Sequence, residues 1–192
     1  YNLYVIEDAA HAISGKYKGK SLGSIGDFGT FSFHETKNII AGEGGALLIN
    51  IPVFEDKAEL VWEKGTNRAE FARGEVDKYE WKAIGSSFYP SEITAAYLYA
   101  QLENIEVIQS KRGVLWQRYF EEFKVLENEG DVLLPAIPDY ASNNMHMFYL
   151  ICKSKKDRDL LIEDLAKNDI CAVFHYLPLH QSPFFKAQYK GE

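Results

Sequence analysis

The sequence predicts an α/β fold, and two observations lead to that prediction. Short apolar segments bounded by glycines occupy the first half of the chain, as expected for strands inside a covered sheet. Longer segments with helical spacing of apolar residues dominate the second half. Hydrophobic residues make up 46% and aromatic residues 14% of the 192 residues, which is enough to build a core.

Three strands are expected in the first half. The apolar run "LYVI" at residues 3–6 ends at the acidic pair Glu7–Asp8, so it predicts a buried strand with a carboxylate at its carboxyl end. Residues 30–33 and 46–49 are rich in β-forming or apolar side chains, and glycines separate them. These segments therefore predict one sheet of short strands.

The helical pattern begins at Val53. Ser91 precedes "EITAAYLYAQLENIEVIQ", where its hydroxyl is placed to cap a helix rich in alanine and leucine. The other expected elements are a helix over residues 111–127, a strand over 147–151, an amphipathic helix over 155–170 and a strand over 171–176. The composition changes near residue 90, which predicts two domains over residues 1–90 and 91–192.

Charge and composition exclude several classes of function. The net charge of −7 and the pI of about 5.3 argue against nucleic acid or an anionic membrane surface as a partner. No apolar run approaches the roughly 20 residues of a membrane span. Cys152 and Cys171 form neither a disulfide framework nor a zinc site, which favours a cytoplasmic location and no bound metal. Because the chain opens inside an apolar run without methionine, we expect it to be a piece of a longer protein.

One site could be formed by three residues of the first half, Asp8, Ser32 and Lys37. Taken singly, Asp8 is a helix N-cap, Ser32 a strand hydroxyl and Lys37 a solvated loop lysine. Together they match the needs of pyridoxal 5'-phosphate: a lysine for the covalent Schiff base, a carboxylate for the pyridine nitrogen, and hydroxyls for the phosphate. This combination predicts an electron-sink cofactor near the carboxyl ends of the strands.

Three segments closely resemble the DegT/DnrJ/EryC1/StrS family of sugar-nucleotide aminotransferases: "VIEDAAHA", "GDFGTFSFHETKN" and "GEGGALLIN". The resemblance extends over nearly the whole chain. It implies the aspartate aminotransferase-like fold of type I pyridoxal-phosphate-dependent transferases. Residues 1–90 would then be the C-terminal part of the cofactor-binding large domain, and residues 91–192 an incomplete small α+β domain.

The family motif implies a role for five residues of the first half. Lys37 matches the lysine that binds the cofactor, and Asp8 the acid at the pyridine nitrogen. His11 matches a family Gln or His near the ring hydroxyl, and Ser32 a phosphate ligand. Asn67, in "GTNR", resembles an asparagine that reaches the phosphate of a neighbouring subunit's cofactor. The resemblance thus implies a homodimer with shared active sites.

The segments over residues 63–103 and 172–180 are most similar to one branch of the family. That branch converts dTDP-4-keto-6-deoxy-D-glucose to dTDP-4-amino-4,6-dideoxy-D-galactose with L-glutamate as amino donor and 2-oxoglutarate as product. The implied pathway is cell-surface polysaccharide (lipopolysaccharide) biosynthesis. Amination of another sugar at C3 or C4 stays open. A dehydratase on the same scaffold is disfavoured, since such enzymes replace the lysine that Lys37 matches with histidine.

Histidines and cations in the rest of the chain are weaker candidates. The segment "FHYLPLH" contains His175 and His180 and resembles the family segment beside the sugar nucleotide. We therefore expect one of these histidines to contact substrate. The alternative is that they pack within a strand. His146 is a similar but weaker candidate, and His34 is expected to be structural. Three cations could meet phosphate or carboxylate groups or simply form solvated faces: Arg68, Arg73 and Lys78.

The chain also departs from the family. Many members read G-x-N-x-R before the "AA…QL" helix. In this chain Ser87 stands at the asparagine position and Tyr89 at the arginine position. The branch described above also has serines at this point, so the departure favours that branch. It also weakens the case for an arginine that binds the donor's carboxylate. The family also has residues before and after the stretch that this chain covers, so a non-catalytic chain that acts only through dimer contacts stays open.

Overall fold

The computed structural model describes residues 1–188, which divide into two compact units. Unit 1 comprises residues Tyr1–Phe123 and Pro135–Tyr149, and unit 2 comprises Lys124–Leu134 and the described residues from Leu150 onward. The predicted boundary at residue 90 falls inside unit 1. The assignment of residues 1–90 and 91–192 to two domains stays a prediction.

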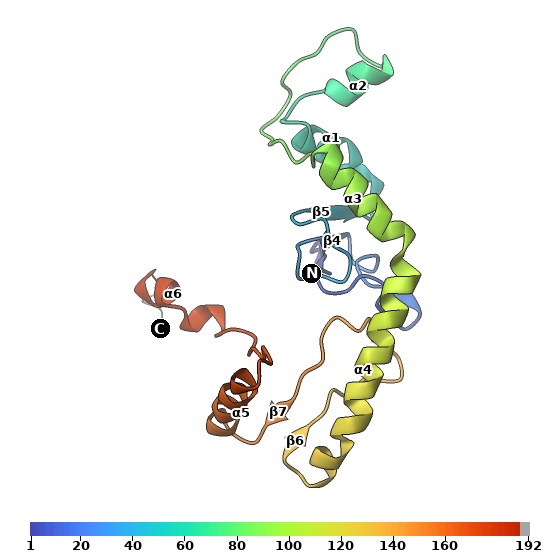
Figure 1. Ribbon diagram of the computed structural model, residues 1–192. Helices are drawn as coiled ribbons and strands as arrows, with labels where there is room; N and C mark the ends of the chain where they lie inside the picture. The colour runs from blue at the N-terminus through green and yellow to red at the C-terminus, as the bar shows by residue number, and fades with distance from the viewer. Residues whose placement is uncertain (189–192) are drawn as a thin grey trace. The chain divides into compact units, whose positions relative to one another are not determined.

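Unit 1 contains a three-stranded sheet in the order β1 (Ile6–Asp8), β4 (Phe28–Ser32) and β5 (Gly45–Ile49). β1 runs parallel to β4, and β4 runs antiparallel to β5. Figure 1 shows β4 and β5 side by side. The three predicted strands therefore exist, but the first is shifted, because residues 6–8 rather than 3–6 pair with β4. A separate hairpin joins β2 (Lys16–Tyr17) and β3 (Lys20–Ser21).

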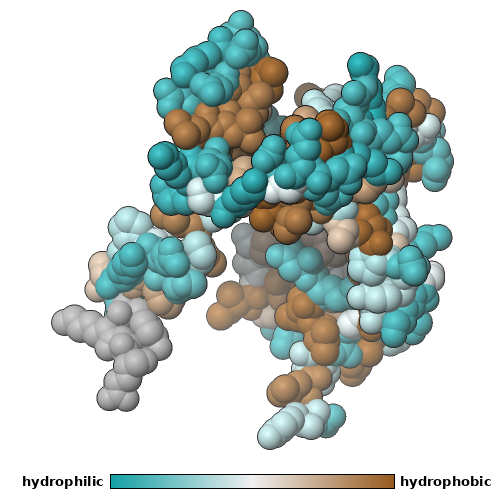
Figure 2. Space-filling model, turned by 90° about the horizontal axis from the view of Figure 1, so that it is seen from below, coloured by the Kyte–Doolittle hydropathy of each residue, from teal (hydrophilic) through white to brown (hydrophobic). Residues whose placement is uncertain are grey.

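The expected burial is wrong for residues 3–6 and for the first residues of β5, whereas β4 is half-buried to buried. Leu3, Tyr4, Val5 and Ile6 are 76%, 65%, 55% and 67% exposed, and Leu47 of β5 is 54% exposed. Figure 2 shows hydrophobic residues gathered at the surface in several patches. The reason is that no layer of the described residues covers these side chains, although their sequence is that of a covered sheet.

The helices of unit 1 follow the predicted pattern. Ser91 caps α3 (Glu92–Glu103) as predicted, since its Oγ accepts a hydrogen bond of 3.1 Å from the amide of Thr94. The expected helix over 111–127 is longer, because α4 begins at Ile105 and ends at Asn128. The other helices of this unit are η1 (Pro52–Phe54), α1 (Glu55–Trp62) and α2 (Arg68–Arg73).

Unit 2 pairs β6 (Val132–Leu133) with β7 (Ile151–Cys152) in an antiparallel ladder. α5 (Lys155–Lys167) forms the predicted amphipathic helix, and η2 (Leu179–Gln181) and α6 (Pro183–Gln188) follow. Of the predicted strand over residues 147–151, only Ile151 lies in a strand, as the first residue of β7. The predicted strand over residues 171–176 is wrong, because no described segment forms a ladder with these residues.

Two classes of feature are absent from residues 1–188. No helix there is both long and apolar enough to cross a membrane. No group of three or more His, Cys, Asp or Glu side chains in this range is arranged to hold a metal ion.

Candidate active site

The carboxyl ends of two parallel strands bring Asp8 and Ser32 to one edge of the sheet. The register pairs Asp8, the last residue of β1, with Thr30 of β4, and Ser32 ends β4 two residues later. Asp8 is exposed, and its Oδ1 accepts a hydrogen bond of 3.1 Å from the amide of Ala10. The carboxylate thus closes a turn and still faces solvent at the edge where open α/β sheets bind ligands.

Lys37 lies in the turn that follows β4. Its amide donates to the carbonyl of His34 at 2.9 Å, and the Nδ1 of His34 lies 2.9 Å from the hydroxyl of Thr36. The next two residues, Asn38 and Ile39, are 5% and 0% exposed. These two buried residues directly follow the half-buried Lys37 and fix the backbone there, which limits where the Lys37 side chain can reach. The ring of His34 bonds Thr36 within this turn, and the structural role expected for it stays a prediction.

Asn38 connects this turn to distant parts of unit 1. Its Nδ2 donates to Oε1 of Gln109 at 2.9 Å and to the carbonyl of Asn144 at 2.7 Å. Its Oδ1 lies 2.7 Å from Nδ1 of His146. Asn38 was not among the residues predicted from the sequence to form the site. The only available signal was a polar residue inside the apolar run that follows Lys37.

His11 is exposed in the segment after β1, and its ring stacks on His146 with a centroid separation of 4.3 Å and an interplanar angle of 29°. Both rings line an open pocket of about 220 Å³ with Trp116 and Asn143. The structure thus brings a weak sequence candidate, His146, into contact with one of the five motif residues.

Glu7 ties the loop before β4 to β1. Its Oε1 accepts hydrogen bonds from the amides of Ile25 at 2.5 Å and Gly26 at 2.6 Å, and its Oε2 accepts one from Gly23 at 2.9 Å. Burial works to raise the pKa of the Glu7 carboxyl, but the three amides outweigh it and hold the pKa below its ordinary value. Glu7 was expected only as part of an acidic pair, and the structure separates its role from that of Asp8.

Asn67 lies at the N-terminus of α2, which Figure 1 shows apart from β4 and β5. Its side chain is 2% exposed, with Nδ2 donating to the carbonyl of Lys78 at 3.0 Å and Oδ1 accepting from the amide of Glu80 at 2.7 Å. Both polar groups bond the 78–80 loop, and the side chain is almost fully buried against it. Contact with the phosphate of a neighbouring subunit's cofactor stays a prediction.

The weaker cationic candidates of this region differ in their partners. Arg73 forms hydrogen bonds with Glu59 and Glu75, and these bonds raise the pKa of its guanidinium. Arg68 lies 3.9 Å from the buried carboxylate of Glu63. Arg73 therefore has a structural role in this conformation.

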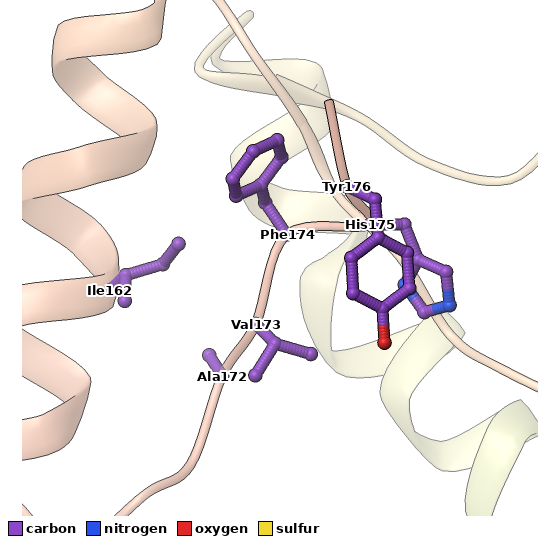
Figure 3. A pocket seen from close by; sticks show the side chains of 6 residues that line it. All are labelled: Ile162, Ala172, Val173, Phe174, His175 and Tyr176. Carbon is purple, nitrogen blue, oxygen red and sulfur yellow. The ribbon is translucent and has the colours of Figure 1, made fainter. Parts of the chain in front are cut away.

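Unit 2 carries the two predicted substrate histidines. His175 lines an open pocket of about 380 Å³, in which Figure 3 shows Ile162 of α5 pointing toward the 172–176 segment. Its ring meets that of Tyr176 edge-on at 5.5 Å, and Tyr176 has a left-handed φ of 41°. The guanidinium of Arg158 lies over the ring of Phe174 at 4.1 Å. His180 is exposed in η2 and does not line this pocket.

Comparisons with known proteins agree on one family. The model of the DegT/DnrJ/EryC1/StrS aminotransferase family matches residues 1–192. The uncharacterized protein MJ1066 of Methanocaldococcus jannaschii is 34% identical over 192 residues, which cover 97% of this chain and 49% of that protein. The UDP-4-amino-4,6-dideoxy-N-acetyl-beta-L-altrosamine transaminase of Helicobacter pylori is 29% identical over 194 residues, with 97% and 48% covered.

A solved structure shares the fold. The putative sugar aminotransferase Spr1654 of Streptococcus pneumoniae, in its PMP form, superposes with a TM-score of 0.83 at 25% identity, over 97% of this chain and 48% of that one. The expected fold is thereby confirmed over this stretch. The chain spans about half the length of the curated relatives it matches.

Proposed function

The chain belongs to the DegT/DnrJ/EryC1/StrS aminotransferase family, and from this premise we propose that its protein transfers an amino group to a nucleotide-linked keto sugar. The family depends on pyridoxal phosphate, and the solved relative Spr1654 is known in PLP and PMP forms. One observation of the structure supports the proposal most directly: Asp8 and Ser32 end two paired parallel strands, and Lys37 follows in an anchored turn.

The residues present fit this cofactor. An exposed carboxylate at Asp8 suits the protonated pyridine nitrogen, and the Ser32 hydroxyl at the end of the neighbouring strand suits the phosphate. Lys37 would hold the cofactor covalently, and His11 would lie near the ring hydroxyl. When bound, pyridoxal phosphate supplies an electron sink for the carbanion formed at the α-carbon of the donor.

The chain's own groups then move protons. After the amino donor displaces it, the Lys37 amine would remove the proton from the donor's α-carbon and return one to the sugar carbon. The Asp8 carboxylate would lie beside the ring nitrogen, where positive charge is needed. The anchor at Asn38 and Ile39 restricts the lysine to this region, which favours proton transfer over a short path.

The substrates we propose follow the branch resemblance. The sugar would be dTDP-4-keto-6-deoxy-D-glucose, the donor L-glutamate, and the product dTDP-4-amino-4,6-dideoxy-D-galactose. The alternative is another 3- or 4-keto sugar nucleotide, since the Helicobacter relative is named for a UDP-linked sugar. We propose His175 or His180 as a substrate contact, a homodimer with shared sites as the working form, and the cytoplasm as its location.

The proposal is tested by trapping the cofactor. The protein is incubated with pyridoxal phosphate and reduced with borohydride, and the modified lysine is mapped by mass spectrometry. We expect modification at Lys37, its loss in Lys37→Ala, and its persistence in the control Lys57→Ala, which removes an exposed lysine of α1. Modification scattered over many lysines and unchanged in Lys37→Ala would contradict the proposal and favour the non-catalytic alternative.

A further inference from the structure

The segment over residues 143–147 is held in a strained conformation by several partners. Met145 has a φ of 56°, in the left-handed region that non-glycine residues rarely adopt. Arg112 donates from Nε to the carbonyl of Met145 at 3.0 Å and from Nη2 to that of His146 at 2.6 Å. Trp116 donates from Nε1 to the carbonyl of Met147 at 3.0 Å. Strain that is held by this many contacts is a feature typical of functional segments.

This segment forms hydrogen bonds with two regions of the candidate site, the residues after β1 and the lysine turn after β4. The Nδ2 of Asn144 donates to the carbonyls of His11 at 2.5 Å and Ile13 at 3.1 Å. The carbonyl of Asn144 accepts from Asn38, the neighbour of Lys37 in the chain, and from Nε2 of Gln109 at 3.0 Å. The segment therefore links the residues after β1 to the lysine turn after β4.

The hydrogen bonds around Asn38 show that Nδ1 of His146 carries a hydrogen. Both hydrogens of Asn38 Nδ2 are used by Gln109 and Asn144, so Oδ1 must be the acceptor that faces His146. Nδ1 of His146, 2.7 Å away, must then donate. One ring nitrogen is thereby assigned its proton, and the plane of the ring is held by a buried amide.

The ring held in this way is the one that stacks on His11. Stacked rings at this separation attract one another and restrict rotation about the side-chain torsions. We propose that His146 is a positioning residue, which holds the His11 imidazole in the orientation that the cofactor ring requires. This inference rests on the proposed function, because His11 faces a cofactor only if the protein binds one.

Two substitutions separate the ring contact from the hydrogen bond. His146→Phe keeps a ring for the stack and removes the donor to Asn38, whereas His146→Gln keeps a side-chain N–H and removes the ring. The control is Gln117→Ala, since Gln117 is exposed on α4, where its Nε2 donates to Oε1 of Glu121 at 2.8 Å, and it does not line the pocket of the two histidines. Circular dichroism verifies folding, and His146→Leu replaces His146→Gln if the latter does not fold.

Two measurements are made on each protein. The first is the position of the His11 ring-proton signals by NMR without cofactor, which reports the ring current of its neighbour. The second is the dissociation constant of pyridoxal phosphate from its visible absorbance. We expect His146→Gln to shift the His11 signals and to weaken binding by about two- to tenfold, the scale of one aromatic pair. His146→Phe keeps the stacked ring but loses the hydrogen bond that orients it, so it should weaken binding less than His146→Gln does. Gln117→Ala should stay within about twofold of the wild type.

The outcomes are distinct. Unchanged His11 signals and unchanged binding in His146→Gln would overturn the role of His146, as would an equal loss of binding in His146→Phe or Gln117→Ala. A wild-type protein that takes up no pyridoxal phosphate at Lys37 would overturn the proposed function, and the role of His146 with it. If the wild-type protein binds the cofactor, the comparison of the variants tests the role of His146 independently of the proposed function.

Discussion

Glu7 and Gly23 are joined by a hydrogen bond of 2.9 Å, from the backbone amide of Gly23 to the carboxylate Oε2 of Glu7. With two further amides on the other oxygen, this carboxylate attaches the 23–26 loop to β1. The strand it belongs to ends one residue later at Asp8, so the position of the proposed cofactor ligand depends on it.

Glu7→Gln should destabilise the protein in a pH-dependent way. The pKa of Glu7 is lower in the folded state than its ordinary value of 4.5, so its contribution is present above that value and is lost as pH falls through the folded-state pKa. We expect a loss of about 1–3 kcal/mol in unfolding free energy at pH 7, measured by urea unfolding, and a smaller difference at pH 3.

Glu129→Gln provides the control for this measurement, because Glu129 is exposed and follows α4. It should change the unfolding free energy little at either pH. A difference between Glu7→Gln and wild type that stays the same at pH 3 would mean that the charge of Glu7 does not matter for stability.

Asp8→Asn should reduce catalysis without unfolding the protein. Asparagine keeps an oxygen for the amide of Ala10, which Asp8 bonds at 3.1 Å, and it removes the charge that the pyridine nitrogen needs. We expect kcat of the protein that carries this chain to fall by about 10²–10³-fold, the scale seen when one electrostatic partner is removed from an active site. The unfolding midpoint should stay near that of the wild type. An Asp8→Asn protein as active as wild type would exclude Asp8 from that role.

Asn67→Ala separates the two roles open to Asn67. Its side chain bonds the backbone of Lys78 and Glu80 from a buried position, so its loss should cost about 1–3 kcal/mol of unfolding free energy. If this local role is the only one, the affinity for pyridoxal phosphate should change little under conditions where the variant is folded. A strong loss of affinity in the folded variant would instead support contact with the phosphate across a subunit interface.

Gly65→Ala should be among the more damaging substitutions in unit 1. Gly65 has a φ of 76°, and a Cβ there would lie 1.9 Å from the carbonyl oxygen of Ala83. We expect a loss of about 2–4 kcal/mol in unfolding free energy, because the backbone must shift and the left-handed conformation disfavours alanine.

The matched control is Gly113→Ala in α4. A Cβ at Gly113 meets no atom within 4 Å, and alanine favours a helix interior over glycine. This variant should be stabilised by about 0.5–1 kcal/mol in the same unfolding experiment. Equal effects at the two glycines would contradict the close backbone approach at Gly65.

The sequence determined those features that depend on neighbours in the chain. Ser91 caps α3 as predicted, since a cap involves a side chain and an amide three residues away. Helical spacing of apolar residues is local in the same way, and the strands around residues 30 and 46 are near enough in the chain to pair with each other. The resemblance of three short motifs was also enough to identify the family, because these motifs carry the groups that a cofactor needs.

Only the tertiary structure decided the features that depend on distant residues. Residues 171–176 have the composition of a strand, but a strand also needs a partner, and none of the described residues provides one. The contact between His11 and His146 joins positions whose sequence carries no sign of the other. Asn38 and His146 are likewise paired across 108 positions of the chain. Side-chain pairing of this kind is specified by how the elements pack, so no local pattern in the sequence could predict it.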